Sequence, residues 1–289
     1  MESREFFRSI SCGLDAVQRE LQAQAESIVR TWSLQGRSSQ HVEQVVRHLF
    51  EKPGKMLRPA LVLLSAGLAS SREPGEQPNL VRLATAVELL HSASLIHDDI
   101  IDEEELRRGR PALHQRFGDH TAVLVGDILY SHSFALLTEL ELPRWERHKE
   151  IFRLYCDTTS RMCLGEICEQ QVLDQELTLS FPEYLEILVN KTATLMSACC
   201  RGAGIVSDAE PALVERLSEF GLAFGLAFQL ADDASDRDAV VSQECDLLAA
   251  ARKQLARARG LLGDLPDSPY RRELLSACDF ILIPAGLAP

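Results

Sequence analysis

The sequence lacks the features of secreted, disulfide-bonded and membrane-spanning proteins. No C-x-x-C pair occurs among its eight cysteines, which fall within apolar helical patterns and are expected to be reduced, intracellular and mostly packed. Residues 1–8 contain Glu2 and Glu5 and precede no apolar run, so we expect no signal peptide. No stretch approaches the roughly 18 uninterrupted apolar residues of a spanning helix. These absences predict a soluble, cytoplasmic protein without a membrane span.

Positive charge is also scarce. The chain has 30 Lys and Arg residues against 43 Asp and Glu, which gives a formal net charge of −13. A field of this sign repels nucleic acids and anionic membranes, so neither is expected as a partner. An anionic substrate would therefore need a local cluster of cations or a bound metal. The hydrophobic share of 46% and the charged share of 25% are those of a globular protein with a buried core.

Alternating strand patterns are nearly absent, and helical periodicity covers most of the chain. Long helical patterns joined by short loops predict an all-α fold, a large and mostly antiparallel helical bundle. The expected helices span residues 12–34, 40–50, 60–69, 80–105, 121–140, 147–173, 181–204, 211–235, 246–262 and 270–283. No clear linker interrupts them, so residues 1–289 are expected to form a single domain.

One short acidic motif occurs twice, each time near the end of an expected helix. Two adjacent aspartates are followed by a third that lies four residues after the first, which places the first and third on one helix face. The two copies, called the first and second acidic trio below, are Asp98, Asp99 and Asp102, and Asp232, Asp233 and Asp236.

Both trios follow core-like apolar residues, so their like charges would raise one another's pKa unless a cation lay among them. Carboxylate oxygens without a His and Cys cluster favour Mg²⁺ over zinc. A single trio could be an ordinary group of acidic residues at an exposed helix end, but two copies with the same spacing favour a metal site.

Cations are concentrated beside the first acidic trio. Lys55 and Arg58 follow a Gly turn, and Arg107 and Arg108 come within two turns after Asp102. Arginine can bind phosphate oxygens through two donors, and lysine acts as a point charge. Either cluster alone could be a solvated face. In so acidic a chain, next to carboxylates, both are better interpreted as diphosphate ligands.

Two further polar positions lie inside apolar helical patterns. His91 is two turns before Asp98 on the same helix face, where it is either a packed core histidine or a ligand. Lys191 precedes Thr192 within the pattern at 181–204, and a buried lysine needs an anionic partner.

Together these motifs resemble the trans-prenyl diphosphate synthases, the polyprenyl synthetases related to farnesyl diphosphate synthase. The resemblance runs from about Phe50 to Asp236 and rests on the joint order and spacing of its motifs. These are GKMLRP at 54–59, ELLHSASLIHDDIID at 88–102, RRGRPALHQRFG at 107–118, VGDILY at 125–130, KT at 191–192 and FQLADDASD at 228–236.

The resemblance implies an all-α bundle around a deep central cavity, usually a homodimer. In that family the two acidic motifs face each other and hold three Mg²⁺ ions on an allylic diphosphate. Carried over by position, the metal ligands would be Asp98, Asp99, Asp102, Asp232, Asp233 and Asp236. Lys55, Arg58, His91 and Arg108 would contact isopentenyl diphosphate, and Arg107, Lys191, Thr192 and Gln229 would surround the allylic substrate, the last three in the catalytic step.

The implied reaction adds isopentenyl diphosphate head-to-tail to an allylic diphosphate. Mg²⁺ and cationic side chains neutralise the leaving diphosphate, so that the allylic C–O bond ionises in a dry cavity. The isopentenyl double bond then attacks the carbocation, and a proton is lost to the departing diphosphate. Positioning and electrostatics supply the catalysis without a protein nucleophile.

Three departures from the family pattern are visible. The segment after residue 236 is shortened, and no lysine lies between Asp236 and Lys253. The family's Gly-Glu-x-x-Gln motif ends here in Glu169, and Met56 stands where Arg is common. Weaker stabilisation of the leaving diphosphate and a more open cavity are expected, and with them low activity or dependence on a partner subunit.

Alternative functions on the same fold therefore stay open. One is a catalytically weak accessory or regulatory subunit of a heteromeric synthase, and another is a Mg²⁺-dependent terpene cyclase or diphosphate hydrolase. For a synthase, the small Ala93, five residues before the first acidic trio, predicts products longer than farnesyl, because an aromatic residue at that position stops the chain early in the family. Phe134 is the expected floor of the channel, while close helix packing is the other explanation of Ala93.

Overall fold

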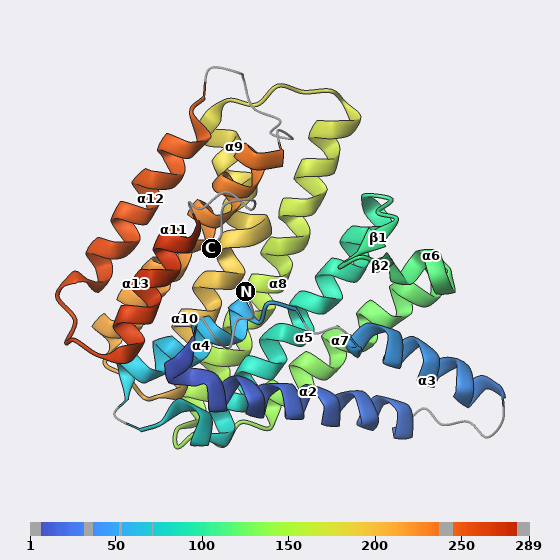
Figure 1. Cartoon of the computed structure of the whole chain (residues 1–289), viewed down its shortest axis with the longest axis horizontal. Helices are drawn as coiled ribbons and strands as arrows, with labels where there is room; N and C mark the ends of the chain where they lie inside the picture. The colour runs from blue at the N-terminus through green and yellow to red at the C-terminus, as the bar shows by residue number, and fades with distance from the viewer. Residues whose placement is uncertain (1–6, 32–36, 52–53, 71, 237–244, 282–289) are drawn as a thin grey trace. The chain divides into compact units, whose positions relative to one another are not determined.

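The computed structural model describes residues 7–31, 37–51, 54–70, 72–236 and 245–281, and nearly all of them are helical (Figure 1). The predicted all-α fold is thus confirmed. In chain order the elements are η1 (Arg8–Ile10), α2 (Ser11–Thr31), α3 (Arg37–Phe50), α4 (Leu57–Ala69), η2 (Pro74–Glu76), α5 (Pro78–Ile101), β1 (Leu106–Arg107), β2 (Arg110–Pro111), α6 (Leu113–Phe117), α7 (Asp119–Thr138), α8 (Trp145–Asp174), α9 (Phe181–Leu188), the π-helical turn η3 (Val189–Ala193), α10 (Thr194–Val206), α11 (Pro211–Asp236), α12 (Leu247–Gly263) and α13 (Pro269–Ile281).

The chain divides into two compact units. Unit 1 comprises residues 1–60 and 74–141, and unit 2 comprises residues 61–73 and 142–289, so α4 begins in the first and continues in the second. The first acidic trio lies in unit 1 and the second in unit 2. The expectation of one domain over residues 1–289 stays a prediction.

Unit 1 is organised by α5 and α7, which pack side by side (Figure 1). The hydroxyl of Ser133 on α7 donates to the carbonyl of Ala86 on α5 at 2.8 Å, which satisfies a buried polar group and fixes the register of the pair. Close to the acidic end of α5, the His97 ring lies over Gly126, where a Cβ would come within 2.1 Å of its Nε2 atom. The α5 helix is therefore held firmly along its length up to the first acidic trio.

A two-residue turn connects β1 to β2 immediately after α5. Arg108 and Gly109 have φ values of 55° and 73°, as required by the tight turn of a two-residue hairpin. Glycine adopts this backbone readily, whereas Arg108 does so at a cost of about 1–2 kcal/mol. The hairpin contains three arginines, at 107, 108 and 110, and Arg107 pairs with Asp99 near the end of α5.

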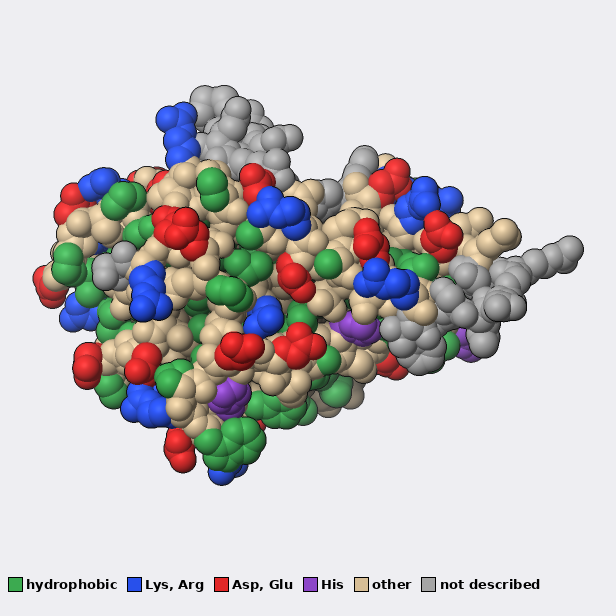
Figure 2. Space-filling view, turned by 90° about the horizontal axis from the view of Figure 1, so that it is seen from below, with side chains coloured by type: hydrophobic (Ala, Val, Ile, Leu, Met, Phe, Trp, Pro, Cys, Tyr) green, Lys and Arg blue, Asp and Glu red, His purple; other side chains and the backbone are tan. Residues whose placement is uncertain are grey.

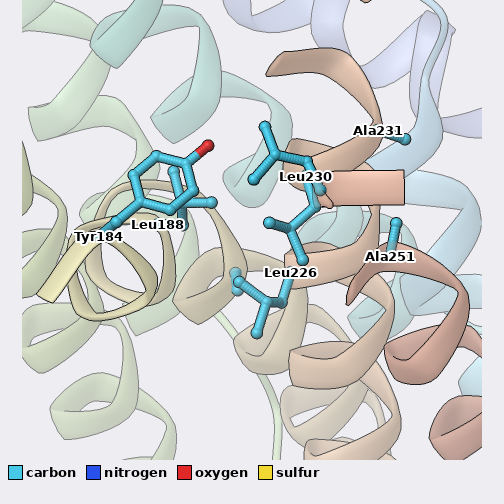
Figure 3. Packing of buried hydrophobic residues seen from close by; sticks show 8 residues of the cluster. Tyr184, Leu188, Leu226, Leu230, Ala231 and Ala251 are labelled. Carbon is cyan, nitrogen blue, oxygen red and sulfur yellow. The ribbon is translucent and has the colours of Figure 1, made fainter. Parts of the chain in front are cut away.

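Unit 2 is built on α10 and α11, which approach each other through small residues. Gly221 and Gly225 on α11 face the backbone of α10 and η3, where a Cβ would lie 2.5 Å from the Met196 carbonyl oxygen and 2.8 Å from the Ala193 Cα atom. On the other side, α11 packs along α12. A hydrophobic cluster joins α9, α11 and α12, and within it the Tyr184 hydroxyl points toward α11 (Figure 3).

Some boundaries differ from the sequence prediction. The α5 helix ends at Ile101 rather than 105, and Asp102 is its C-cap residue. The expected helix at 181–204 is interrupted by η3, and α4 begins before Pro59, because proline is tolerated in the first helical turn. The hairpin and the short α6 went unpredicted.

The eight cysteines are all free thiols, but they are less packed than expected. Three are buried, at 199, 200 and 278, whereas Cys12, Cys163 and Cys168 are exposed. The apolar periodicity predicts that a cysteine lies on a helix, but not whether other helices cover it.

Among the described residues, α7 alone has the length and apolar composition of a candidate membrane span, with a mean hydropathy of 1.3 over its 18-residue window. A single helix of this kind is weak evidence for a span, since the core helices of many proteins pass the same test. On the face drawn in Figure 2, acidic and basic side chains are interspersed, with hydrophobic side chains between them.

Candidate active site

The first acidic trio lies where α5 ends. Asp99 is buried, Asp98 is half-buried and Asp102 is exposed. The negative end of the helix dipole makes a helix C-terminus unfavourable for carboxylates, so three of them there require compensating cations. One cation comes from the protein, because Arg107 Nε donates to Asp99 Oδ1 at 2.7 Å and the guanidinium also forms a salt bridge with it.

Arg58 and His91, both half-buried, are in contact in unit 1. Arg58 Nη1 lies 2.8 Å from His91 Nε2, and since arginine can only donate, the imidazole nitrogen accepts. Burial, reinforced by Arg58, Arg108 and Arg107, holds the pKa of His91 well below its ordinary value. His91 is therefore a neutral acceptor at pH 7 that orients the Arg58 guanidinium.

Glu88 is a further member of this cluster that the sequence analysis did not identify. It lies one turn before His91 and is almost completely buried. Burial raises the pKa of Glu88, although the positive charges of Arg58 and Arg108 act in the opposite direction. Arg108 and Glu88 both lie against Gly54, where a Cβ would come within 2.5 Å of Arg108 Nη2 and 3.2 Å of Glu88 Oε1. The Gly turn at 54 is thus needed for close packing around two charged groups.

Two small cavities open beside Arg108. One, of about 80 Å³, is lined in part by Asp99, Arg107, Arg108 and Arg110, and the other, of about 50 Å³, by Gly54, Glu88 and Arg108. Ser92 lines both. An anion in the first cavity would lie beside the three arginines of the hairpin. Lys55, which was predicted to join them, is exposed at the start of α4.

The second acidic trio ends α11, and a chain of hydrogen bonds holds its middle residue. Thr192 donates to Gln229 Oε1 at 3.0 Å, and Gln229 Nε2 donates to Asp233 Oδ1 at 2.8 Å. The Tyr184 hydroxyl donates to the other oxygen, Asp233 Oδ2. Burial and this contact raise the pKa of Tyr184 above its ordinary value, so it remains a donor at neutral pH. Asp232 is exposed.

Lys191, in η3, contacts two carboxylates on α8. Its ammonium lies 2.9 Å from Glu166 Oε2 and also pairs with Glu169. Gly165 permits this approach, since a Cβ there would lie 2.6 Å from the Lys191 backbone nitrogen. Within the π-helical turn, Lys191 thus contacts Glu166 and Glu169, while the adjacent Thr192 contacts Gln229.

In both trios the middle carboxylate is bound by protein side chains, Asp99 by Arg107 and Asp233 by Gln229 and Tyr184. Within the described residues, no group of three or more His, Cys, Asp or Glu side chains is close enough to hold a metal ion. The Asp236 side chain lies outside the described residues. The expected ligand set of all six aspartates stays a prediction.

Glu88 and Tyr184 could have been suspected from the sequence, because each is a polar residue within an apolar helical run. The significance of Glu169 was visible only as a departure from the family motif, and its contact with Lys191 depends on the π-helical turn.

Comparisons with known proteins agree with the motifs. The family model for polyprenyl synthetase matches residues 39–243. A geranylgeranyl diphosphate synthase of Methanosarcina mazei is 35% identical over 80% of this chain and 65% of its own length. An octaprenyl diphosphate synthase of Haemophilus influenzae is 34% identical over 68% of this chain and 57% of its own length. The chain thus spans less than two thirds of the length of these relatives.

Solved structures extend the likeness over almost the whole chain. A polyprenyl synthase from Caulobacter crescentus, in complex with calcium and isoprenyl diphosphate, has a TM-score of 0.78 at 26% identity and covers 97% of both chains. A geranylgeranyl pyrophosphate synthetase from Pyrococcus horikoshii has a TM-score of 0.82 at 22% identity, over 98% of this chain and 99% of its own. The latter likeness concerns the fold.

Proposed function

The chain belongs to the polyprenyl synthetase family, and from this membership we propose that it is a Mg²⁺-dependent prenyltransferase that adds isopentenyl diphosphate head-to-tail to an allylic diphosphate. The observation that carries the proposal is the contact between half-buried Arg58 and His91, together with exposed Arg108, which lines a cavity with Asp99 of the first acidic trio. These cations and the neighbouring carboxylates suit one diphosphate and the metal-bound form of a second.

The donor set fits magnesium. Carboxylates at the two helix ends offer hard oxygen ligands, and the six aspartates of the two trios are the proposed ligands: Asp98, Asp99 and Asp102 in unit 1, and Asp232, Asp233 and Asp236 in unit 2. Mg²⁺ commonly binds through one or two carboxylates and completes its coordination with water and substrate phosphates, so a preformed cage is not required. When bound, it would neutralise the allylic diphosphate as a leaving group.

The protein's own residues supply position and charge. We propose that Arg58, Arg108 and Lys55 bind isopentenyl diphosphate, with neutral His91 orienting Arg58. These contacts would hold the isopentenyl double bond near the allylic carbon, so that the two substrates react within one complex and no longer depend on a random encounter.

On the allylic side, the proposed contacts are Arg107, Lys191, Thr192 and Gln229. Arg107 is anchored to Asp99, and Thr192 and Gln229 belong to the hydrogen-bond chain that ends at Asp233. These anchors fix where the donors point before the substrate binds, which lowers the cost of organising them.

The proposed products are longer than farnesyl. Ala93 is buried on α5 and has only a methyl group at the position where a ring would stop the chain in the proposed channel, and Phe134, the proposed floor of that channel, is half-buried on α7. Relatives include geranylgeranyl, octaprenyl and, in Arabidopsis thaliana, solanesyl diphosphate synthases. The proposal also includes a homodimer in the cytoplasm.

The test is to incubate the purified protein with Mg²⁺, isopentenyl diphosphate and, in turn, dimethylallyl, geranyl and farnesyl diphosphate, and to size the products by chromatography. We expect chains beyond farnesyl, and we expect Asp98→Ala and Asp232→Ala to abolish turnover with unchanged helical content. Asp174→Asn, an exposed carboxylate at the end of α8, is the matched control and should retain activity.

Normal turnover by both alanine variants would refute the metal assignment. For product length, Ala93→Phe should shorten the chains, since a ring fills the space that the methyl leaves. An unchanged product distribution would refute that part of the proposal.

A further inference from the structure

Lys191 is paired with more negative charge than it can neutralise. Its ammonium contacts both Glu166 and Glu169, and the side chains of all three are mostly shielded from solvent. Although burial acts to lower it, the pKa of Lys191 is raised, because the two carboxylates outweigh the desolvation. The lysine is fully charged at neutral pH, and its local surroundings have a net negative charge.

The two carboxylates are held differently. Glu166 is the more buried, with a side chain 11% exposed, and it also accepts a hydrogen bond from Gln170 Nε2 at 3.3 Å on its own helix. The Glu169 side chain is 20% exposed, and its charge also contributes to the raised pKa of Tyr184. Glu169 therefore lies within electrostatic range of Tyr184, whose hydroxyl donates to Asp233.

An anion that binds Lys191 must compete with Glu169. A diphosphate has several negative charges, and like charges at close range in a partly shielded site repel strongly. A neutral glutamine at 169 would leave the lysine with one carboxylate partner and remove a negative charge from the approach to it. The energetic effect of Glu169 is thus confined to ligands that use Lys191.

We propose that Glu169 is an affinity-setting residue that holds Lys191 in an occupied ion pair and thereby weakens binding of the allylic diphosphate, but not of isopentenyl diphosphate. This inference rests on the proposed function for the identity of the substrate. It concerns this chain's own departure at position 169, and Glu169 acts through Lys191 rather than on the reacting atoms.

The kinetic test compares Glu169→Gln with Glu169→Asp, which keeps the charge, and with Asp174→Asn on the same helix. We expect the allylic KM of E169Q to fall about tenfold, while the KM for isopentenyl diphosphate stays within twofold. The allylic KM of E169D should stay closer to that of the unsubstituted protein, and D174N should not differ. An unchanged or raised allylic KM in E169Q would overturn the inference, as would an equal change for both substrates.

A binding measurement separates this inference from the proposed function. Titration calorimetry with inorganic pyrophosphate and Mg²⁺ needs no turnover, and E169Q should bind about tenfold more tightly than the unsubstituted protein. Tighter binding without prenyl products would support the role of Glu169 and count against the synthase. Unchanged binding with normal prenyl products would do the reverse.

A double-mutant cycle tests whether the effect passes through the lysine. In a Lys191→Gln background, E169Q should raise pyrophosphate affinity much less than tenfold, because the pair it would release is gone and only the direct repulsion by Glu169 is removed. A tenfold gain that persisted without Lys191 would overturn the inference. Circular dichroism is recorded for each variant, and Glu169→Ala removes the same charge should the glutamine variant lose helix.

Discussion

The close contact between Gly165 and the backbone of Lys191 predicts that a larger residue at 165 will displace Lys191 and reduce activity. In Gly165→Ala, the new Cβ would lie 2.6 Å from the Lys191 nitrogen and 3.0 Å from its Cα atom. Both are backbone atoms, so no side chain can swing aside, and α8 and η3 must separate by roughly 0.8 Å to reach ordinary van der Waals contact.

The stability cost and the functional cost should differ. Overpacking costs about 1–3 kcal/mol, while replacing glycine by alanine within a helix returns about 1 kcal/mol, so we expect a net loss of about 0–2 kcal/mol. Activity is more sensitive, since a displacement of about 1 Å in a positioning group can cost roughly 100-fold. The variant should thus fold with nearly normal stability and lose most of its turnover.

Urea unfolding followed by circular dichroism measures the stability, and the product assay with an allylic primer measures the activity. The control is Gly260→Ala on α12, where no atom lies within 4 Å of the new Cβ. That variant should gain up to about 1 kcal/mol in unfolding free energy with unchanged activity. If G165A retained the turnover of the unsubstituted protein, the close contact would not be what positions Lys191.

Two further predictions follow from buried polar groups. Tyr184→Phe keeps the ring in its hydrophobic cluster but removes the donor to Asp233, so unfolding free energy in urea should fall by about 1–2 kcal/mol, and an unchanged urea midpoint would contradict the contact. Because the pKa of His91 is depressed in the folded state, the unfolded chain takes up a proton first as the pH falls below about 6.5, and stability should drop by up to about 1.4 kcal/mol per pH unit. Thermal unfolding between pH 7.5 and 5.5 measures this, with His91→Gln expected to flatten the slope and parallel curves for the two proteins counting against it.

The helices could be predicted because their determinants are local. Apolar spacing placed α5, α7 and α11 to within a few residues, and the boundary errors occur where capping decides, as at Asp102. The π-helical turn had no local signal, since the apolar pattern around Lys191 continues through it. Its cause is tertiary: the turn fits the backbone of η3 against Gly165 on α8.

The sequence could predict which residues form the candidate site, but not which of their side chains pair with each other. Motif order grouped Arg58, His91 and Arg108, and in the structure a hydrogen bond joins Arg58 to His91, while Arg108 lies with Glu88 against Gly54. What the sequence could not give is which carboxylate each cation uses. Arg107, in β1, pairs with Asp99, and Glu88, one turn before His91 on α5, lies near Arg58 and Arg108.

These pairings bear on how an acidic protein binds an acidic substrate. Most of the cations proposed to receive a diphosphate already lie near carboxylates of the protein: Glu88 near Arg58 and Arg108, Asp99 on Arg107, and Glu166 and Glu169 on Lys191. Long-range attraction is weak in a chain of net charge −13, so binding must proceed by exchange of partners at short range. Such an exchange favours ligands that have several negative charges and oxygen atoms placed so that they can replace a carboxylate. A diphosphate with its metal meets that condition, whereas a singly charged anion does not, and the strength of each internal pair then sets the affinity for its substrate.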